Sequence, residues 1–293
     1  MSKSMSRFAA GAVALAFVAG TASAQLEYYA LTSDGNLSYV NGGVQSVIGS
    51  TGLNNSVNSL AQNWQSRGGG GNMWASQGFE VFGPPTGKTG HVDTGTGAFS
   101  LVNTLSDDAG TLPLGGGIAF DTDGTVWQAS QNLLGGTTLF HHDGAGNIIS
   151  QVNVAISGNA VGALYLRSDG EAIIGDNTGK IYVVNKTNGN ISSINATGLA
   201  GLTEFSTGAR KKDGFFSGSQ FSSTWQDVAY AVTNDAGIAK IYRINMFGNN
   251  FSLQDTLDVT GQGNMWGLQV IPTPASAALL GLGGLVATRR RRS

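Results

Sequence analysis

The middle of the chain, residues 117–150, decides which fold we expect. It reads GIAFD (Gly117–Asp121), Thr122-Asp-Gly124, TVWQA (Thr125–Ala129), LFHHD (Leu139–Asp143) and GNIIS (Gly146–Ser150). The short apolar segments have the length of β-strands. An Asp followed by Gly is typical of a hairpin turn, because the Asp side chain caps the turn and the Gly adopts a positive φ. The stretch therefore predicts two consecutive hairpins, which make four antiparallel strands.

The second of these hairpins recurs along the chain. The strand that ends in Asn or Asp has copies in LSYVN (Leu37–Asn41), TGHVD (Thr89–Asp93), IYVVN (Ile181–Asn185) and IYRIN (Ile241–Asn245), at intervals of 42 to 60 residues. The first hairpin has its clearest copy in GALYL (Gly162–Leu166), Ser168-Asp-Gly170 and EAII (Glu171–Ile174). Four strands in about 50 residues are typical of a β-propeller blade.

The first repeat is incomplete, because residues 28–40 supply only part of a blade. The segment MWGLQV (Met265–Val270) at the far end is a candidate for the missing strand, and a ring closed in this way has one exposed sheet edge fewer. We therefore expect an all-β body over residues 25–270, folded as a β-propeller of about five blades. Six blades, a pair of β-sandwiches and a β-solenoid are the alternatives that the pattern leaves open.

Composition limits the chemistry that this body supports. The 293 residues include 45 Gly, no Cys and three His, which excludes disulfides, thiolate metal sites and Cys nucleophiles. Between the basic residues of the two ends, ten Lys and Arg stand against eighteen Asp and Glu, so the body has a formal charge near −8. This sign argues against nucleic acid and anionic membrane surfaces as partners.

No catalytic or cofactor-binding motif is recognisable in the body. Asp121 and Asp123 resemble the start of a calcium loop, but Thr125 and Asn132 stand where an EF-hand needs acidic ligands. A hairpin turn is the preferred interpretation, and calcium at these two residues is the alternative; no other cofactor is expected. Gly83–Thr89 is one residue short of a phosphate-binding loop and is expected to be an ordinary loop. The five Trp, about one per repeat, are expected to pack in the core or between blades, with stacking on a glycan as the alternative.

Residues 1–24 have the three parts of a secretory signal peptide. Lys3 and Arg7 form the positive region, residues 8–20 are small or apolar, and Ala22-Ser-Ala24 precedes Gln25. We expect export through the Sec translocon and cleavage by signal peptidase between Ala24 and Gln25.

Residues 271–293 carry a second targeting signal. Pro272-Thr273-Pro274 precedes a small or apolar stretch at 275–288, and Arg289, Arg290, Arg291 and Arg292 follow. The tail resembles the PEP-CTERM sorting signal of Gram-negative bacteria, in which a Pro-Glu-Pro motif precedes a short apolar transmembrane segment and a cluster of Arg; here Thr273 replaces the Glu. The resemblance implies a transient membrane anchor, held by its Arg residues on the cytoplasmic side, and processing by an exosortase-like enzyme.

These features together predict an exported bacterial protein of the cell surface or extracellular matrix. We favour a non-catalytic binding or structural propeller, with exopolysaccharide as a candidate partner. The alternative is a secreted carbohydrate-active hydrolase or lyase on the same scaffold, because propellers host both classes. Two carboxylates that meet at the central channel would favour the enzyme.

Overall fold

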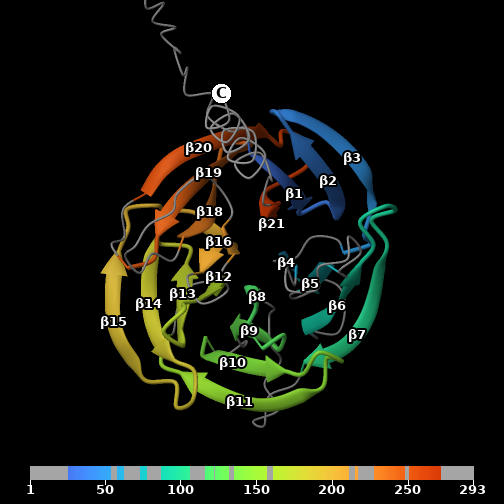
Figure 1. The fold of residues 1–293 in the computed structure, drawn as a ribbon. Helices are drawn as coiled ribbons and strands as arrows, with labels where there is room; N and C mark the ends of the chain where they lie inside the picture. The colour runs from blue at the N-terminus through green and yellow to red at the C-terminus, as the bar shows by residue number, and fades with distance from the viewer. Residues whose placement is uncertain are drawn as a thin grey trace, which may run out of the picture.

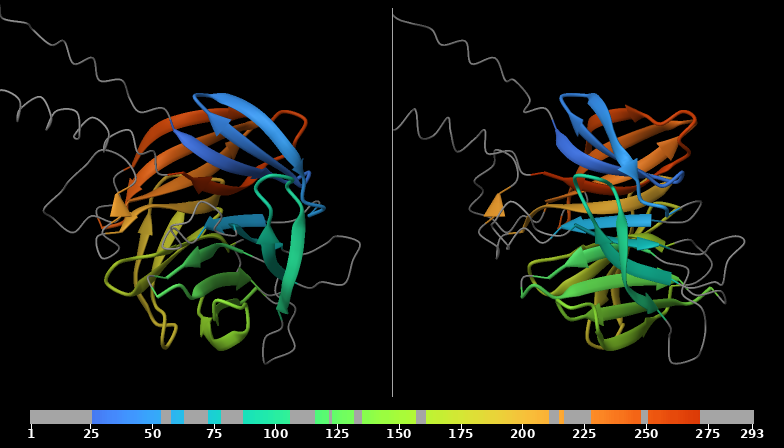
Figure 2. Two further views of the ribbon diagram at one scale, coloured as in Figure 1. Left: turned by 45° about the vertical axis from the view of Figure 1, so that its right-hand side comes forward. Right: turned by 90° about the vertical axis from the view of Figure 1, so that its right-hand side faces the viewer.

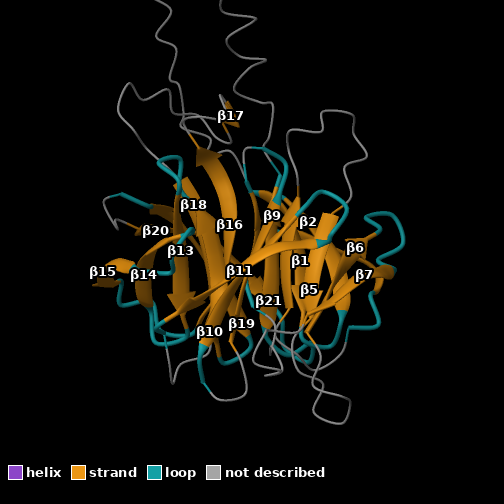
Figure 3. Ribbon diagram, turned by 90° about the horizontal axis from the view of Figure 1, so that it is seen from below, coloured by secondary structure: helices purple, strands orange, loops and turns teal. Residues whose placement is uncertain are grey.

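The protein is a five-bladed β-propeller (Figure 1). The computed structural model describes residues 26–53, 58–62, 73–77, 87–105, 116–121, 123–131, 135–156, 161–210, 215–216, 228–247 and 251–271. Within these ranges the chain forms strands and loops and no helix (Figure 3). Five antiparallel sheets surround one axis, so the predicted fold is confirmed, and six blades, a sandwich pair and a solenoid are excluded.

Each blade has four strands in sequence order from the axis outward, except blade 1, whose inner strand comes from the far end of the body (Figure 1). Blade 1 contains β21 (Met265–Val270), β1 (Glu27–Thr32), β2 (Asn36–Asn41) and β3 (Val44–Ser50). Blade 2 contains β4 (Asn58–Gln62), β5 (Met73–Gln77), β6 (Gly87–Val92) and β7 (Phe99–Leu105). Blade 3 contains β8 (Ile118–Phe120), β9 (Val126–Gln131), β10 (Thr137–His142) and β11 (Ile148–Val154). Blade 4 contains β12 (Val161–Leu166), β13 (Glu171–Asp176), β14 (Lys180–Asn185) and β15 (Ile191–Ala196). Blade 5 contains β16 (Leu202–Arg210), β18 (Val228–Asp235), β19 (Ile238–Asn245) and β20 (Phe251–Asp258), with β17 (Phe215–Phe216) paired to the other edge of β16.

The turns between the third and fourth strands have the predicted chemistry. In blade 3 the carboxylate of Asp143 accepts hydrogen bonds from the backbone N–H groups of Ala145 (2.9 Å) and Asn147 (2.8 Å). Equivalent side chains accept backbone N–H groups in three other blades: Asp93 from Gly95 and Thr96, Asn185 from Thr187 and Asn188, and Asn245 from Phe247. In blades 2 to 5 the Asn or Asp at the end of the third strand is therefore a turn cap.

The Gly in these turns also allows neighbouring blades to approach closely. Gly146 has φ of +90°, and a side chain there would overlap Val102 on β7 of blade 2. At the axis, a Cβ atom on Gly162 of β12 would lie 2.6 Å from the carbonyl oxygen of Thr203 on β16. Glycine is required at both positions because no space remains for a side chain.

Strands from both ends of the body close the ring. β21 pairs with β1 in an antiparallel ladder that places Tyr28 opposite Val270 and Ala30 opposite Leu268. The ladder continues one residue further, since the N–H of Ile271 donates to the carbonyl of Glu27 at 2.8 Å. The closure predicted from Met265–Val270 is confirmed. It also places the start of β1 and the end of β21 at the same end of the propeller, which we call the exit end.

The hydrophobic core lies mainly between adjacent blades, and the two side views of Figure 2 show how the blades stack around the axis. One cluster joins blades 3 and 4 through residues that include Trp127, Leu164 and Ile174. Another joins blades 5 and 1 through residues that include Tyr230, Ile241 and Leu268. Because each interface is apolar, no blade can separate from its neighbours without exposing core surface.

Candidate functional site

One carboxyl group lies where the inner strands meet. Glu204 on β16 is fully buried, and its carboxyl oxygens accept the backbone N–H groups of Leu60 (3.2 Å) and Phe205 (2.8 Å) and the hydroxyl of Ser59. Ser59 and Leu60 belong to β4 of blade 2, which is not adjacent to blade 5 in the ring. The side chain of Glu204 therefore crosses the axis and ties two distant blades together.

Further hydrogen bonds link β16 to β21, β21 to β4 and β4 to β8, and the backbones of these inner strands do not pair with one another. The side-chain to backbone bonds are Val270 N–H to Ser206 Oγ (2.9 Å), Thr203 Oγ1 to the Met265 carbonyl (2.9 Å), Gln62 N–H to Gln269 Oε1 (2.9 Å) and Ile118 N–H to Ser59 Oγ (2.9 Å). Small polar side chains on the inner strands thus satisfy backbone groups that a sheet would otherwise pair. At this level the centre of the ring is occupied by structural contacts.

The chemistry at the axis follows from this burial. Burial raises the pKa of Glu204 well above its ordinary value, because the charged form loses its hydration. Among the described inner-strand residues Glu204 is the only Asp or Glu, so no second carboxyl faces it. The two-carboxylate geometry of a glycosidase is not formed by these residues.

The predicted calcium candidates lie in the turn between β8 and β9. Asp123 accepts hydrogen bonds from the N–H (2.9 Å) and hydroxyl (2.6 Å) of Thr125, and Gly124 has φ of +87°, which is the predicted turn geometry. Asp121 forms an ion pair with Lys186 of blade 4. Within the described part of the chain, no three Asp, Glu or His side chains gather closely enough to hold a metal ion. The hairpin turn is the preferred interpretation of these residues, and calcium at Asp121 and Asp123 stays the untested alternative.

Two of the Trp pack as predicted. The ring of Trp127 stacks on His141 (centroids 4.1 Å apart, planes 8° apart), and Lys186 lies 5.2 Å above it. Trp74 contacts His91 edge-on at 4.7 Å in the equivalent cross-strand pair of blade 2. Both Trp side chains are buried, so neither is an open surface for stacking a sugar ring. Trp64 and Trp225 lie outside the described residues.

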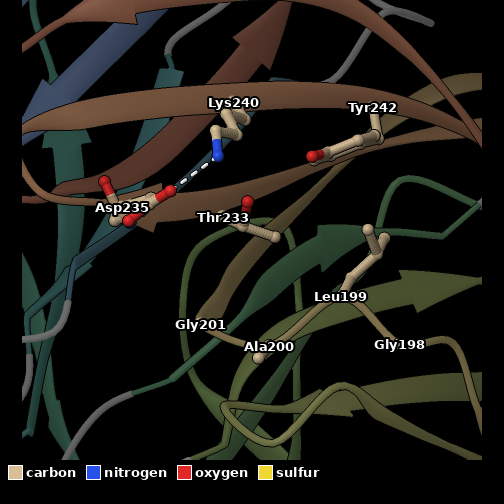
Figure 4. Close-up of a pocket in the computed structure, with 9 residues that line it drawn as sticks. Gly198, Leu199, Ala200, Gly201, Thr233, Asp235, Lys240 and Tyr242 are labelled. Atoms are coloured by element: carbon tan, nitrogen blue, oxygen red, sulfur yellow. Dashed lines mark hydrogen bonds and ion pairs between the residues drawn. The ribbon is translucent and has the colours of Figure 1, made fainter.

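A pocket of about 400 Å³ lies between blades 4 and 5 (Figure 4). One side is formed by residues 198–201, the loop that leads from β15 into β16. The other side is formed by residues of the β18–β19 hairpin: Thr233, Asn234, Asp235, Lys240 and Tyr242.

A tight turn fixes the polar groups of this pocket. Because Asp235 pairs with Ile238, only Ala236 and Gly237 form the connection, and both have positive φ (+48° and +87°), as in a type I′ turn. The turn brings the Lys240 ammonium to 2.7 Å from the Asp235 carboxylate. This ion pair raises the pKa of Lys240, and the same hydrogen bond lowers the pKa of Asp235, so both groups are charged at neutral pH.

The pocket lies at the opposite end of the propeller from the exit end. Asn234 in its wall accepts the N–H of Met265 (2.8 Å) and donates to the Met265 carbonyl (2.9 Å). Met265 begins β21, whereas Val270, where the chain leaves, ends it. At about 3.3 Å per residue, the six-residue strand separates the two ends by roughly 17 Å. We call the end that carries the pocket the pocket end.

The lining of the pocket suits an uncharged polar ligand. The charges of Lys240 and Asp235 cancel, while together they offer fixed donors and acceptors, and Tyr242 adds an aromatic ring with a hydroxyl. Figure 4 shows the Tyr242 hydroxyl, the Lys240 ammonium and Thr233 turned toward one space. A ligand that carries several hydroxyl groups beside apolar C–H surface matches this lining.

Sequence reasoning missed both Glu204 and the pocket. A signal for Glu204 exists in LTEFS (Leu202–Ser206), where one acid interrupts a strand of apolar and small polar residues. A signal for the pocket turn is the hairpin sequence Asn234-Asp-Ala-Gly237, in which Gly237 readily adopts positive φ whereas Ala236 is of a residue type that rarely does. That the loop after β15 lies beside this turn follows only from the closed ring.

The targeting residues fall outside the described ranges. These are Ala22, Ala24 and Gln25 at the leader, and Pro272, Thr273, Pro274 and Arg289–Arg292 in the tail. Among the residues that the structure does describe, we find no helix with the length and apolarity needed to cross a membrane. The cleavage site and the sorting tail stay predictions from sequence.

Comparisons with known proteins show only distant similarity. No protein-family model matches the chain, and no curated protein matches it. Similar solved structures include a protein of unknown function from Bacteroides caccae (12% identity, TM-score 0.46, 80% of this chain and 74% of that one). Others are the extracellular domain of a two-component system from B. thetaiotaomicron (12%, 0.43, 79% and 28%) and a protein named "putative exo-beta-1,3-galactanase" from Bifidobacterium bifidum (13%, 0.46, 73% and 85%). Similarity at this level carries no argument about function.

Proposed function

We propose that the protein is an exported surface or extracellular-matrix protein of a Gram-negative bacterium, sorted by its PEP-CTERM-like tail, whose propeller is a non-catalytic binding module. The proposal combines the two targeting signals of the sequence with the arrangement of the body. The body would be held at its exit end and would present its pocket end away from the membrane.

The observation that carries the proposal is the position of the chain ends. Glu27 and Ile271 are hydrogen-bonded at the exit end, and the pocket between blades 4 and 5 lies beside Met265 at the pocket end. A membrane segment that follows Ile271 would therefore leave the pocket on the outward side. This is the orientation that a surface-displayed binding module needs.

The ligand that the pocket fits best is an uncharged polysaccharide segment. Exopolysaccharide offers vicinal hydroxyl groups to the Lys240–Asp235 pair and an apolar ring face to Tyr242. The body charge near −8 adds no attraction for anionic polymers, which leaves neutral glycans as the favoured class.

No observation on the described residues favours the enzymatic alternative. The one carboxyl of the inner strands, Glu204, accepts hydrogen bonds from β4 and its own strand instead of facing open solvent. A hydrolase or lyase would need a second polar group aimed at the same substrate atom. We therefore keep binding, and not catalysis, as the proposed activity.

Sorting is tested with tail variants expressed in a host that has an exosortase. Changing Arg289–Arg292 to Ser should release the chain unprocessed, because the basic stop at the cytoplasmic side is lost. Changing Pro272 and Pro274 to Ala should leave it anchored and uncut, because the extended segment before the anchor is altered. Mass spectrometry and cell fractionation report both outcomes, and the mature protein should begin at Gln25. Parent-like localisation and processing of both variants would refute the sorting proposal.

Orientation is tested separately, using the absence of Cys from the sequence. In the anchored Pro272→Ala, Pro274→Ala background, single thiols are introduced as Ala200→Cys at the pocket end and Asn188→Cys at the exit end; both positions are exposed. A bulky thiol reagent applied to cells with the outer membrane opened should modify the first faster than the second, whereas detergent-solubilised protein should react equally. Equal rates before solubilisation would contradict the proposed orientation.

A further inference from the structure

The large exposed apolar side chains of the described residues lie along the outer edges of the blades. The large ones are Val44, Val47, Leu101, Ile148, Ile149, Ile194, Phe247, Phe251 and Leu253. Eight of them are on the outermost strand of a blade, and Phe247 is in the turn that precedes β20. The outer strands form the rim of the propeller (Figure 1). These side chains lie on the strands whose outer edges have no partner in their own sheet, and such edges can pair with a strand of another chain.

Four of the five rim strands also lack the residues that protect sheet edges. β3 (VQSVIGS), β7 (FSLVNTL), β11 (IISQVNV) and β15 (ISSINA) contain no Lys, Arg, Asp, Glu or Pro. Natural edge strands usually carry such residues because their unpaired N–H and C=O groups otherwise pair with another chain. β20 is the exception, since it contains Asp255 and Asp258. In each described sheet the outer strand has a partner on one side only.

β11 is the rim strand best suited to pairing. Its seven residues include no Gly, whereas β3 contains Gly49, and Ile148 and Ile149 expose apolar side chains on the two opposite faces of the strand. An uncharged segment of this length without Pro or Gly is typical of strands that pair with identical strands.

A second copy of this chain is the partner that fits. Two bodies with a charge near −8 repel each other, and they approach at least cost where surface charge is missing, which is the rim. A strand that pairs antiparallel with the same strand of a second copy needs no complementary charge and forms a closed two-fold interface. On β11 a two-fold axis at Ser150 would place Ile149 opposite Gln151 and would bring no like charges together. Asn153, whose carbonyl oxygen lies against Gly189 of blade 4, stays outside this ladder.

We propose that two copies of the protein associate edge to edge through antiparallel pairing of β11 with β11 of the second copy. The pairing continues the four-stranded sheet of blade 3 into an eight-stranded sheet that spans both molecules. It leaves the pocket end and the exit end of each copy free. The association does not depend on the proposed sorting or on the proposed ligand.

The test measures self-association of the purified, full exported protein by sedimentation velocity over a wide range of concentrations. Ile149→Lys should increase the dissociation constant of the dimer at least about tenfold, because a two-fold interface receives the charge twice. Ile149→Val keeps a branched apolar side chain and adds no charge, so the dissociation constant should stay within about threefold of the parent value.

The matched control is Leu253→Lys on β20. Leu253 has 52% exposure against 55% for Ile149, and the substitution changes net charge and apolar surface equally, but β20 already carries two acids. Unchanged melting temperatures show that all three variants are folded. A monomeric parent at every concentration, or equal weakening by Leu253→Lys and Ile149→Lys, would overturn the proposal.

Discussion

Ring closure by β21 is the feature of this fold most open to a quantitative test, and Leu268→Ala is the perturbation. Leu268 is fully buried, lies opposite Ala30 of β1 and packs in the cluster that joins blades 5 and 1. Its contacts in that cluster form only when β21 is paired with β1. The substitution therefore reports on the closing strand itself.

The size of the effect follows from how little the site can relax. Leu→Ala in a core costs about 2–5 kcal/mol, depending on how far the surroundings collapse into the cavity. Here β21 is held by β1 on one side and, on the other, by a hydrogen bond that its Val270 N–H donates to Ser206 and one that its Met265 carbonyl accepts from Thr203, so collapse is restricted. We expect a loss of about 3–4 kcal/mol in the free energy of unfolding, within the range for Leu→Ala. At about 2–4 °C per kcal/mol for a domain of this size, the melting temperature should fall by about 6–16 °C.

The assay is thermal unfolding followed by circular dichroism at two protein concentrations. Leu253→Ala, which truncates a Leu that is 52% exposed on β20, is the matched control and should change stability by less than about 0.5 kcal/mol. A Leu268→Ala melting temperature within the error of the control would refute closure by β21. Two separate transitions in the parent would refute a single cooperative ring.

Two further predictions address the turn glycines and the buried carboxyl. Gly146→Ala should lower the free energy of unfolding, measured in urea, by about 1–3 kcal/mol more than Gly170→Ala does. Both glycines have positive φ, but only at Gly146 does a side chain, Val102, fill the space of a new Cβ atom. Equal losses would show that the backbone angle alone matters. The second prediction concerns pH, because burial raises the pKa of Glu204 in the folded protein. The protonated carboxyl therefore contributes fully to stability below the unfolded-state pKa of about 4.5. This contribution is lost as pH rises through the folded-state pKa. The stability of the parent minus that of Glu204→Gln should therefore decrease with rising pH above about 4.5, and a difference that increases would contradict the assignment.

The blade pattern was predictable because its signals are local. Asp143 caps its turn with a backbone N–H two residues away, and Gly124 needs a positive φ for a turn that spans four residues. Such preferences act within a few residues, so they can be read without knowing the tertiary structure. The number of repeats then determined the number of blades, and the incomplete first repeat indicated the closing strand.

The candidate site was not predictable because its contacts are distant in sequence. Glu204 receives its hydrogen bond from Leu60, 144 residues away, and that pairing exists only once five inner strands converge. The pocket likewise joins a loop after β15 to a turn after β18, and the hairpin sequence of that turn does not report which loop lies beside it. Periodicity reports which face of a strand is buried, but it does not report which strand lies across the axis.

The closing strand also connects the fold to the proposed sorting route. In that route the chain would cross the membrane from its N-terminus, so blades 2 to 5 could form before Met265–Val270 emerges, whereas blade 1 would lack its inner strand until then. The tail begins at the residue that follows, so a membrane stop at Arg289–Arg292 would hold the chain when β21 has just become available outside. Retention at this point would give β21 time to pair with β1 before the body is released. Under this route, a release-prone tail variant and a weakened closing strand act on the same step. Arg289–Arg292→Ser combined with Leu268→Ala should therefore reduce the yield of folded exported protein by more than the product of the two single effects, and a simple product would show that sorting and ring closure are independent.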